Sequence, residues 1–226
     1  ATMSTLHYVG MDVHKETVDV TVLREKDVHP SIEKRLPNQE RAVKKFFKKL
    51  SGEGSVLACY EAGCMGFELQ RMLEDIGVPC IVVAPGKVPR RTADRIKTDR
   101  RDSRTLARYL CSGTLEAIHV PTSEEEAVRD YLRAREDVRI ELAKMKQRVH
   151  KFLLRHGYVY ESNRYWTFRH EKWLRSLVFD ECLLKETFDE YHSRIGELKE
   201  RLKVMDKRID EIATGDPYRA RVEELR

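Results

Sequence analysis

The chain has 226 residues, of which 36% are charged, with a net charge of +5 and a mean hydropathy of −0.59. This length suits one large domain or two small ones. No apolar run approaches the roughly 18 residues that span a membrane. Five cysteines without a CxxC pair indicate reduced thiols in a cytoplasm rather than a disulfide framework. A zinc site at Cys59 and Cys64 lacks two further ligands at a suitable spacing.

The first half of the chain alternates between strand-like and helix-like patterns. Period-two and continuous apolar runs predict strands, whereas three-four spacing predicts helices. The order is three strands, then helix, strand, helix, strand and helix, which indicates an antiparallel meander followed by parallel additions in one mixed sheet. The predicted domain is 3–118, with strands at 6–13, 17–23, 31–36, 56–60 and 79–84, a helix after an Asn38 N-cap, helices at 63–76 and 98–110, and a loop at 85–97.

Four carboxylates in this domain suggest a metal site. Asp12 and Glu61 end two of the apolar runs, and Asp99 and Asp102 are spaced to share one helix face, with Cβ atoms about 5–6 Å apart. Carboxylates at two strand ends opposite two more on a helix could hold two divalent cations about 3.5–4 Å apart for phosphoryl transfer. Without a cation, the clustered charges would raise one another's pKa values. The alternative is that acids are common here and these four do not converge.

A basic segment surrounds two of these acids. Residues 87–108 hold nine basic side chains against three acidic ones, a local charge of +6. Such a stripe suits contacts with phosphates, although a solvated loop is the alternative. The predicted nucleic-acid-binding residues are Lys15, Arg90, Arg91, Arg95, Lys97, Arg100, Arg101 and Arg104.

The second half changes character at Pro121. A capping box of Ser123 and Glu126 opens a long heptad run that only Arg135 interrupts, and a second heptad run follows. We predict an all-α coiled-coil domain at 119–213, in which helices 123–156 and 181–213 form an antiparallel hairpin that pairs with another chain. Between them, aromatic and basic residues alternate over 158–173, where rings either stack on bases or pack the hairpin tip or a dimer contact.

The final residues predict another helix. Asp216 is placed to cap it and Pro217 to occupy its first position, so we interpret 214–226 as the start of a truncated following region.

Three strings resemble a known family. GMDVHK, YEAG and KTDRRDS, in this order, resemble the N-terminal domain of the insertion-sequence-110 family of DEDD transposases over about the first 115 residues. The resemblance implies an α/β ribonuclease-H/RuvC-like fold in a bacterial or archaeal cytoplasm. By motif it makes Asp12, Glu61, Asp99 and Asp102 the catalytic residues and ligands of Mg²⁺, with Mn²⁺ as a possible substitute.

The same resemblance implies a reaction and partners. It implies DNA recombination guided by a structured noncoding RNA, in homodimers or tetramers, with a serine nucleophile in a C-terminal domain that this chain lacks. Ser103 therefore does not inherit that role. Two alternatives stay open: a self-sufficient RuvC-like endonuclease that resolves DNA junctions, and a non-catalytic module for nucleic-acid binding and dimerisation.

Overall fold

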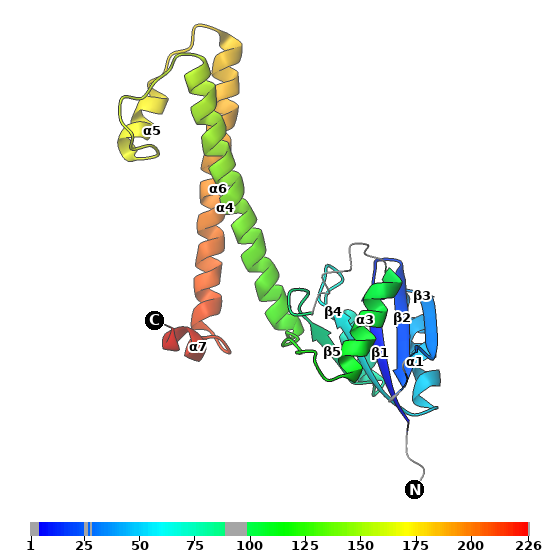
Figure 1. The fold of residues 1–226 in the computed structure, drawn as a ribbon. Helices are drawn as coiled ribbons and strands as arrows, with labels where there is room; N and C mark the ends of the chain where they lie inside the picture. The colour runs from blue at the N-terminus through cyan, green and yellow to red at the C-terminus, as the bar shows by residue number, and fades with distance from the viewer. Residues whose placement is uncertain (1–4, 25–26, 28, 89–98, 226) are drawn as a thin grey trace. The chain divides into compact units, whose positions relative to one another are not determined.

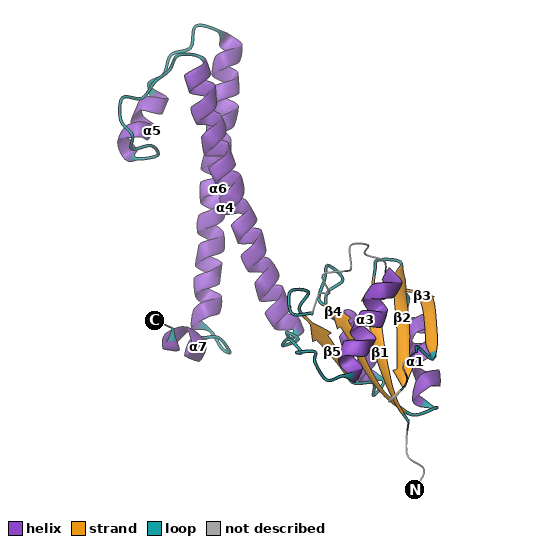
Figure 2. Ribbon diagram, in the orientation of Figure 1, coloured by secondary structure: helices purple, strands orange, loops and turns teal. Residues whose placement is uncertain are grey.

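The computed structural model describes residues 5–24, 27, 29–88 and 99–225, and for residues 99–101 it describes the backbone alone. The chain divides into two compact units, 1–120 and 121–226 (Figure 1). The first unit is a sheet covered by helices, and the second is entirely helical (Figure 2).

The sheet of the first unit has five strands in the order β3-β2-β1-β4-β5. The pairs β1–β2 and β2–β3 are antiparallel, whereas β1–β4 and β4–β5 are parallel, which confirms the predicted mixed sheet. This arrangement fits a ribonuclease-H-like fold. The strands are β1 (Leu6–Val13), β2 (Thr17–Arg24), β3 (Ile32–Pro37), β4 (Ser55–Glu61) and β5 (Cys80–Val83).

Helices cover both faces of this sheet. Helices α1 (Glu40–Ser51) and α2 (Glu68–Asp75) bury Val43, Phe47 and Leu73 against one set of alternating strand residues. Helix α3 (Asp99–Cys111) packs Leu106 and Leu110 with the opposite set. Because side chains of a strand alternate between faces, the two cores lie on opposite sides of one sheet.

Two predicted helix starts in this unit were wrong. The N-cap of α1 is Gln39, and the Asn38 side chain instead donates a 2.8 Å hydrogen bond to the His14 carbonyl in the β1–β2 turn. Helix α2 begins at Glu68 rather than near Gly63, because the preceding segment forms turns and Gly66 adopts a φ of 65°. Apolar spacing does not reveal such turns.

The second unit is built on two 33-residue helices, α4 (Ser123–Arg155) and α6 (Cys182–Thr214). They run side by side in opposite directions (Figure 1), since Arg135 of α4 meets Asp206 of α6, whereas Glu141, further along α4, meets the earlier Arg194. Their apolar seams bury Leu142, Val149, Phe152, Phe188, Ile195 and Leu198 together within one chain. Pairing with another chain stays a prediction.

The one charged residue of the first seam behaves as expected. Arg135 donates a 2.8 Å hydrogen bond from Nε to Asp206, which confirms that it is paired with an acid. The capping box, however, lies one residue earlier than predicted: Thr122 caps α4 and Glu125 reaches back to its backbone amide. Both Thr122 and Ser123 are good caps, so only the backbone geometry decides between them.

Two short helices complete this unit. In chain order, α5 (Phe168–Arg175) comes between α4 and α6, and α7 (Arg219–Glu224) follows α6. The sequence predicted that α7 starts at Pro217, two residues before its actual start. Helix α5 was not predicted at all. Among the described residues, no helix combines the length and the hydropathy needed to cross a membrane.

Candidate active site

Asp12 and Glu61 lie on neighbouring strands at the same edge of the sheet. Asp12 is the penultimate residue of β1 and Glu61 is the last residue of β4. The strands are parallel and Met11 pairs with Tyr60, so Asp12 and Glu61 occupy the next position of this register. Neighbouring strands lie about 4.8 Å apart, and carboxyl ends of parallel strands share one edge. The sheet topology therefore places these two carboxylates next to one another.

The side chain of Asp12 is partly enclosed and has a close polar neighbour. It is 22% exposed, and the Nε2 atom of His14, in the turn after β1, lies 3.2 Å from its Oδ2 atom. The imidazole can donate a hydrogen bond to the carboxylate at this distance. His14 therefore orients Asp12 from the side of the β1–β2 turn.

A second aspartate faces Asp12 across the antiparallel pair. Asp19 of β2 pairs with Asp12 in one direction and with Arg35 of β3 in the other. Its carboxylate is only 3% exposed and accepts hydrogen bonds from Arg35, from Nε at 3.0 Å and from Nη2 at 2.8 Å. A buried carboxylate needs a partner of this kind. Asp19 therefore has a structural role that sequence analysis missed.

A glycine brings α3 into contact with β1 close to Asp12. Gly10 lies two residues before Asp12, so both residues face the same side of the sheet. A Cβ atom at Gly10 would lie 2.2 Å from the carbonyl oxygen of Ser103 and 2.4 Å from the amide nitrogen of Ala107. These distances are too short for any side chain, so the backbone of α3 touches the strand only because residue 10 is glycine.

Two polar contacts fix α3 in this position. The hydroxyl groups of Ser103 and Thr21 share a buried hydrogen bond of 2.9 Å. Arg104 forms an ion pair with Glu33 of β3, and this hydrogen bond raises the pKa of the Arg104 guanidinium. Together with the contact at Gly10, they hold the first turns of α3, which carry Asp102, over the face of the sheet that bears Asp12.

The predicted set of four carboxylates is only partly described. Asp12, Glu61 and Asp102 lie on elements that pack together, whereas the side chain of Asp99 lies outside the described residues. Within the described part of the chain, no three His, Cys, Asp or Glu side chains form a group that could hold a metal ion. The four-carboxylate metal site therefore stays a prediction. Its oxygen donors are the type that Mg²⁺ prefers.

The sulfur atoms of this region are unsuited to a zinc site. Burial raises the pKa of the Cys59 thiol to about 12, and the neighbouring charge of Glu61 adds to this effect. Cys59 lies in the core beneath α3 and donates to the carbonyl of Leu106, whereas Cys64 is exposed. A thiol held protonated in the core is a packing residue.

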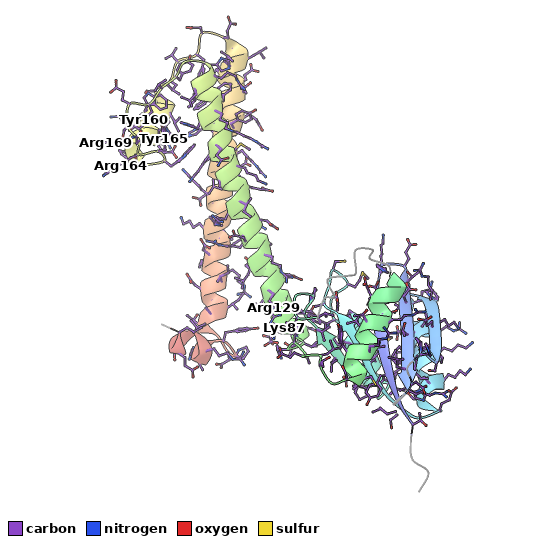
Figure 3. All side chains as sticks on the ribbon, viewed as in Figure 1. Lys87, Arg129, Tyr160, Arg164, Tyr165 and Arg169 are labelled. Atoms are coloured by element: carbon purple, nitrogen blue, oxygen red, sulfur yellow. The ribbon has the colours of Figure 1, made fainter. Side chains whose placement is uncertain are left out.

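The predicted basic surface is described only in part. Lys15 is exposed in the turn beside Asp12, and Arg104 is the ion-pair partner of Glu33. Lys87, labelled in Figure 3, pairs with Glu116 at 2.5 Å. The remaining predictions lie outside the described residues, as whole residues for Arg90, Arg91, Arg95 and Lys97 and as side chains for Arg100 and Arg101.

Comparison with known proteins gives consistent results. The family model for DEDD transposases of the IS110 type, described as "Transposase", matches residues 9–157. The chain is 46% identical over 222 residues to the transposase for insertion sequence element IS1533 of Leptospira borgpetersenii, covering 97% of this chain and 64% of that protein. It is also 44% identical over 140 residues to the protein y4qE of Sinorhizobium fredii, named as a transposase, covering 62% of this chain and 35% of that protein.

The match to the family model includes the part of β1 that carries Asp12, all of β4 with Glu61, and the whole of α3 and α4. The chain spans 64% of the length of the IS1533 transposase. On the extent of these matches, the chain belongs to the insertion-sequence-110 family of transposases.

Proposed function

We propose that this chain is the part of an RNA-guided DNA transposase that performs Mg²⁺-dependent phosphodiester chemistry in a RuvC-like domain. The observation that carries the proposal is the register of β1 and β4, which puts Asp12 and Glu61 side by side at one edge of the sheet. Helix α3, tied to the same face through Gly10, Ser103 and Arg104, would add Asp99 and Asp102.

The residues around this edge suit a bound cation. Arg35 compensates the buried charge of Asp19, so Asp19 keeps its place without becoming a ligand. The acids proposed as ligands are Asp12, Glu61, Asp99 and Asp102, with Mn²⁺ as a possible substitute for Mg²⁺. A divalent cation at this position supplies Lewis-acid polarisation of a scissile phosphate. The role of the protein is to hold the carboxylates, with His14 orienting Asp12.

The rest of the reaction belongs to a larger assembly. We propose that the partners are DNA and a structured noncoding guide RNA, and that protomers form dimers or tetramers through α4 and α6. The serine nucleophile would come from the part of the protein that corresponds to the remaining length of the IS1533 transposase. Within this chain, Ser103 is buried and bonded to Thr21, which gives it a structural role.

The test is a transposition assay with the complete transposase in the presence of its guide RNA and Mg²⁺. Asp12→Asn and Glu61→Gln should each lower the rate about 10²- to 10³-fold, the cost typical of losing one electrostatic group at a reaction centre. Asp75→Asn is the matched control, because Asp75 is exposed on α2, which packs on the other face of the sheet. Full activity of Asp12→Asn would refute the proposed site.

The same proteins distinguish the alternatives. Mg²⁺-dependent strand cleavage by this chain alone, abolished by Asp12→Asn, would favour the junction-resolving endonuclease. No binding of Mg²⁺ or Mn²⁺ at millimolar concentration, measured by calorimetry, would favour the non-catalytic module.

A further inference from the structure

The connection between α4 and α6 carries exposed positive charge that has no ion-pair partner among the described residues. We call residues 158–175, which end with α5, the tip. Six exposed cationic side chains belong to the tip or to the last turns of α4 that lead into it, and none of them has an ion pair among the described residues. These tip cations are Lys151, Arg155, Arg164, Arg169, Lys172 and Arg175.

The shaft formed by α4 and α6 is different. Several of its arginines pair with acids of the same helix, as in Arg133–Asp130, Arg139–Glu136, Arg194–Glu197 and Arg208–Glu211. The exposed Arg129, Arg148 and Arg201 have no ion pair among the described residues, but they are spread along the two helices. The tip has two acids, of which Glu171 accepts bonds from Lys199 at 2.5 Å and from His192 at 3.0 Å, both on α6. Within the tip, only the exposed Glu161 is left to offset its four cations, Arg164, Arg169, Lys172 and Arg175. Uncompensated cations that cluster on one surface indicate an anionic ligand.

The inside of the tip is a packed aromatic cluster. His170 is 3% exposed, and the rings of Tyr160, Tyr165, Trp166 and Trp173 surround it at centroid distances between 4.8 and 5.5 Å. The Nδ1 atom of His170 accepts a 3.2 Å hydrogen bond from the backbone amide of Trp166. This packing and the bonds of Glu171 to α6 fix the tip on the shaft, so its surface is ordered before a ligand binds.

One aromatic ring of the tip is almost fully exposed. Phe168 opens α5 and is 86% exposed, beside Arg169 and within four residues of Arg164. Tyr165 is also partly exposed, at 37%. Figure 3 shows Tyr160, Arg164, Tyr165 and Arg169 gathered at the same end of this unit. An exposed ring flanked by cations offers a nucleic acid both a surface for stacking and partners for its phosphates.

We propose that the tip binds an unpaired stretch of nucleic acid, with Phe168 stacked on a base and Arg164 and Arg169 bound to phosphates. Unpaired strands fit better than duplex, because only unstacked bases expose a face to an aromatic side chain. The inference goes beyond the proposed catalytic function and does not depend on it, since no carboxylate of the first unit takes part.

The experiment uses the whole 226-residue chain and labelled oligothymidylate, with binding followed by fluorescence anisotropy. A duplex of the same length is measured in parallel. The chain has two tryptophans, Trp166 and Trp173, and both belong to the tip. Their emission therefore reports directly on the surroundings of the tip. We expect the strand to change this emission with the same Kd that anisotropy gives.

Variants separate the two kinds of contact. Losing two phosphate contacts in Arg164→Ala/Arg169→Ala should weaken strand binding roughly 25-fold near 0.1 M salt and reduce the log–log salt slope by about 1.4. The matched control is Arg133→Ala/Arg208→Ala, which removes the same charge from the shaft. Phe168→Ala should weaken strand binding roughly 5- to 150-fold and leave duplex binding unchanged, and Phe168→Tyr should restore it.

Four results would overturn the proposal. The first two are tryptophan emission that does not change at saturation, and equal losses of strand affinity in the tip and shaft double variants. The third is an equal effect of Phe168→Ala on the affinities for strand and duplex. The fourth is competition by polyglutamate that is as effective as competition by unlabelled strand, which would point to an acidic protein instead. None of these results bears on the carboxylate site, which Asp12→Asn tests separately.

Discussion

Replacing Gly10 by alanine should push α3 away from the sheet and destabilise the first unit. The added Cβ atom would fall about 1 Å short of an ordinary contact with Ser103 and Ala107, and both contacts are with backbone atoms, which cannot rotate away. Overpacking costs about 1–3 kcal/mol, and stretching the buried Thr21–Ser103 hydrogen bond adds about 1 kcal/mol, so we expect a loss of roughly 2–4 kcal/mol.

Two probes measure this effect in the intact chain. Circular dichroism follows all helices and strands, whereas tryptophan emission follows only the second unit. Gly10→Ala should lower the Tm of the dichroism transition roughly 8–16 °C, at about 4 °C per kcal/mol for a unit of this size. The transition seen by tryptophan emission should not move.

The control is Gly86→Ala. No atom lies within 4 Å of a Cβ at Gly86, so its effect should stay within about 0.5 kcal/mol. If Gly10→Ala were as stable as Gly86→Ala, α3 would not be held against β1 as the structure has it, and the proposal that Asp102 joins Asp12 at one site would lose its support.

Two further predictions follow from pKa shifts. Burial lowers the pKa of His170 below its ordinary value. The unfolded chain therefore binds a proton at this imidazole more readily than the folded chain does. The stability that the neutral ring provides is present above about pH 6.5 and is lost as the pH falls toward the folded pKa. The urea concentration at the midpoint of unfolding, followed by tryptophan emission, should therefore fall on acidification. His170→Gln should weaken this dependence of the midpoint on pH. An equal pH dependence in the unchanged chain and in His170→Gln would contradict the role of His170. Burial also raises the pKa values of the Cys59 and Cys80 thiols. Iodoacetamide applied to the folded chain near pH 8 should therefore modify the exposed Cys64 and Cys182 and leave Cys59 and Cys80 unmodified. Mass spectrometry that found Cys59 alkylated would count against the packing beneath α3.

The positions of Asp12 and Glu61 could be predicted from sequence because each ends an apolar run, and an apolar run of that length predicts a buried strand. Their adjacency could also be predicted from the order of elements. The role of Asp19 could not be predicted from the sequence, because its partner depends on the strand register. Asp19 meets Arg35 only because β2 and β3 pair in one particular alignment. A single sequence without that register shows only an acid inside a strand.

In the second unit, the long helices could be predicted from the sequence, whereas the features set by local backbone geometry could not. The two long helices were predicted from their heptads, and Arg135 from its place in the seam. Helix α5 was missed because eight residues carry too little periodicity, and because its buried residue is His170, a polar type that a hydrophobic pattern does not count. Gly10 was missed because its importance lies in what approaches it from 93 residues further along the chain, the carbonyl of Ser103.

The strand order of the first unit has a consequence for synthesis on the ribosome. Strands β1, β2 and β3 are consecutive in sequence and pair locally, whereas α3 begins 87 residues after Asp12 yet packs on β1. At roughly 5–20 residues per second, the ribosome needs about 4–17 s to add that interval. During this time the nascent sheet exposes the face around Gly10 and Asp12, uncovered by its helix. The proposed carboxylate edge is therefore completed late in this unit, and a nascent chain that has not yet reached Cys111 cannot assemble it.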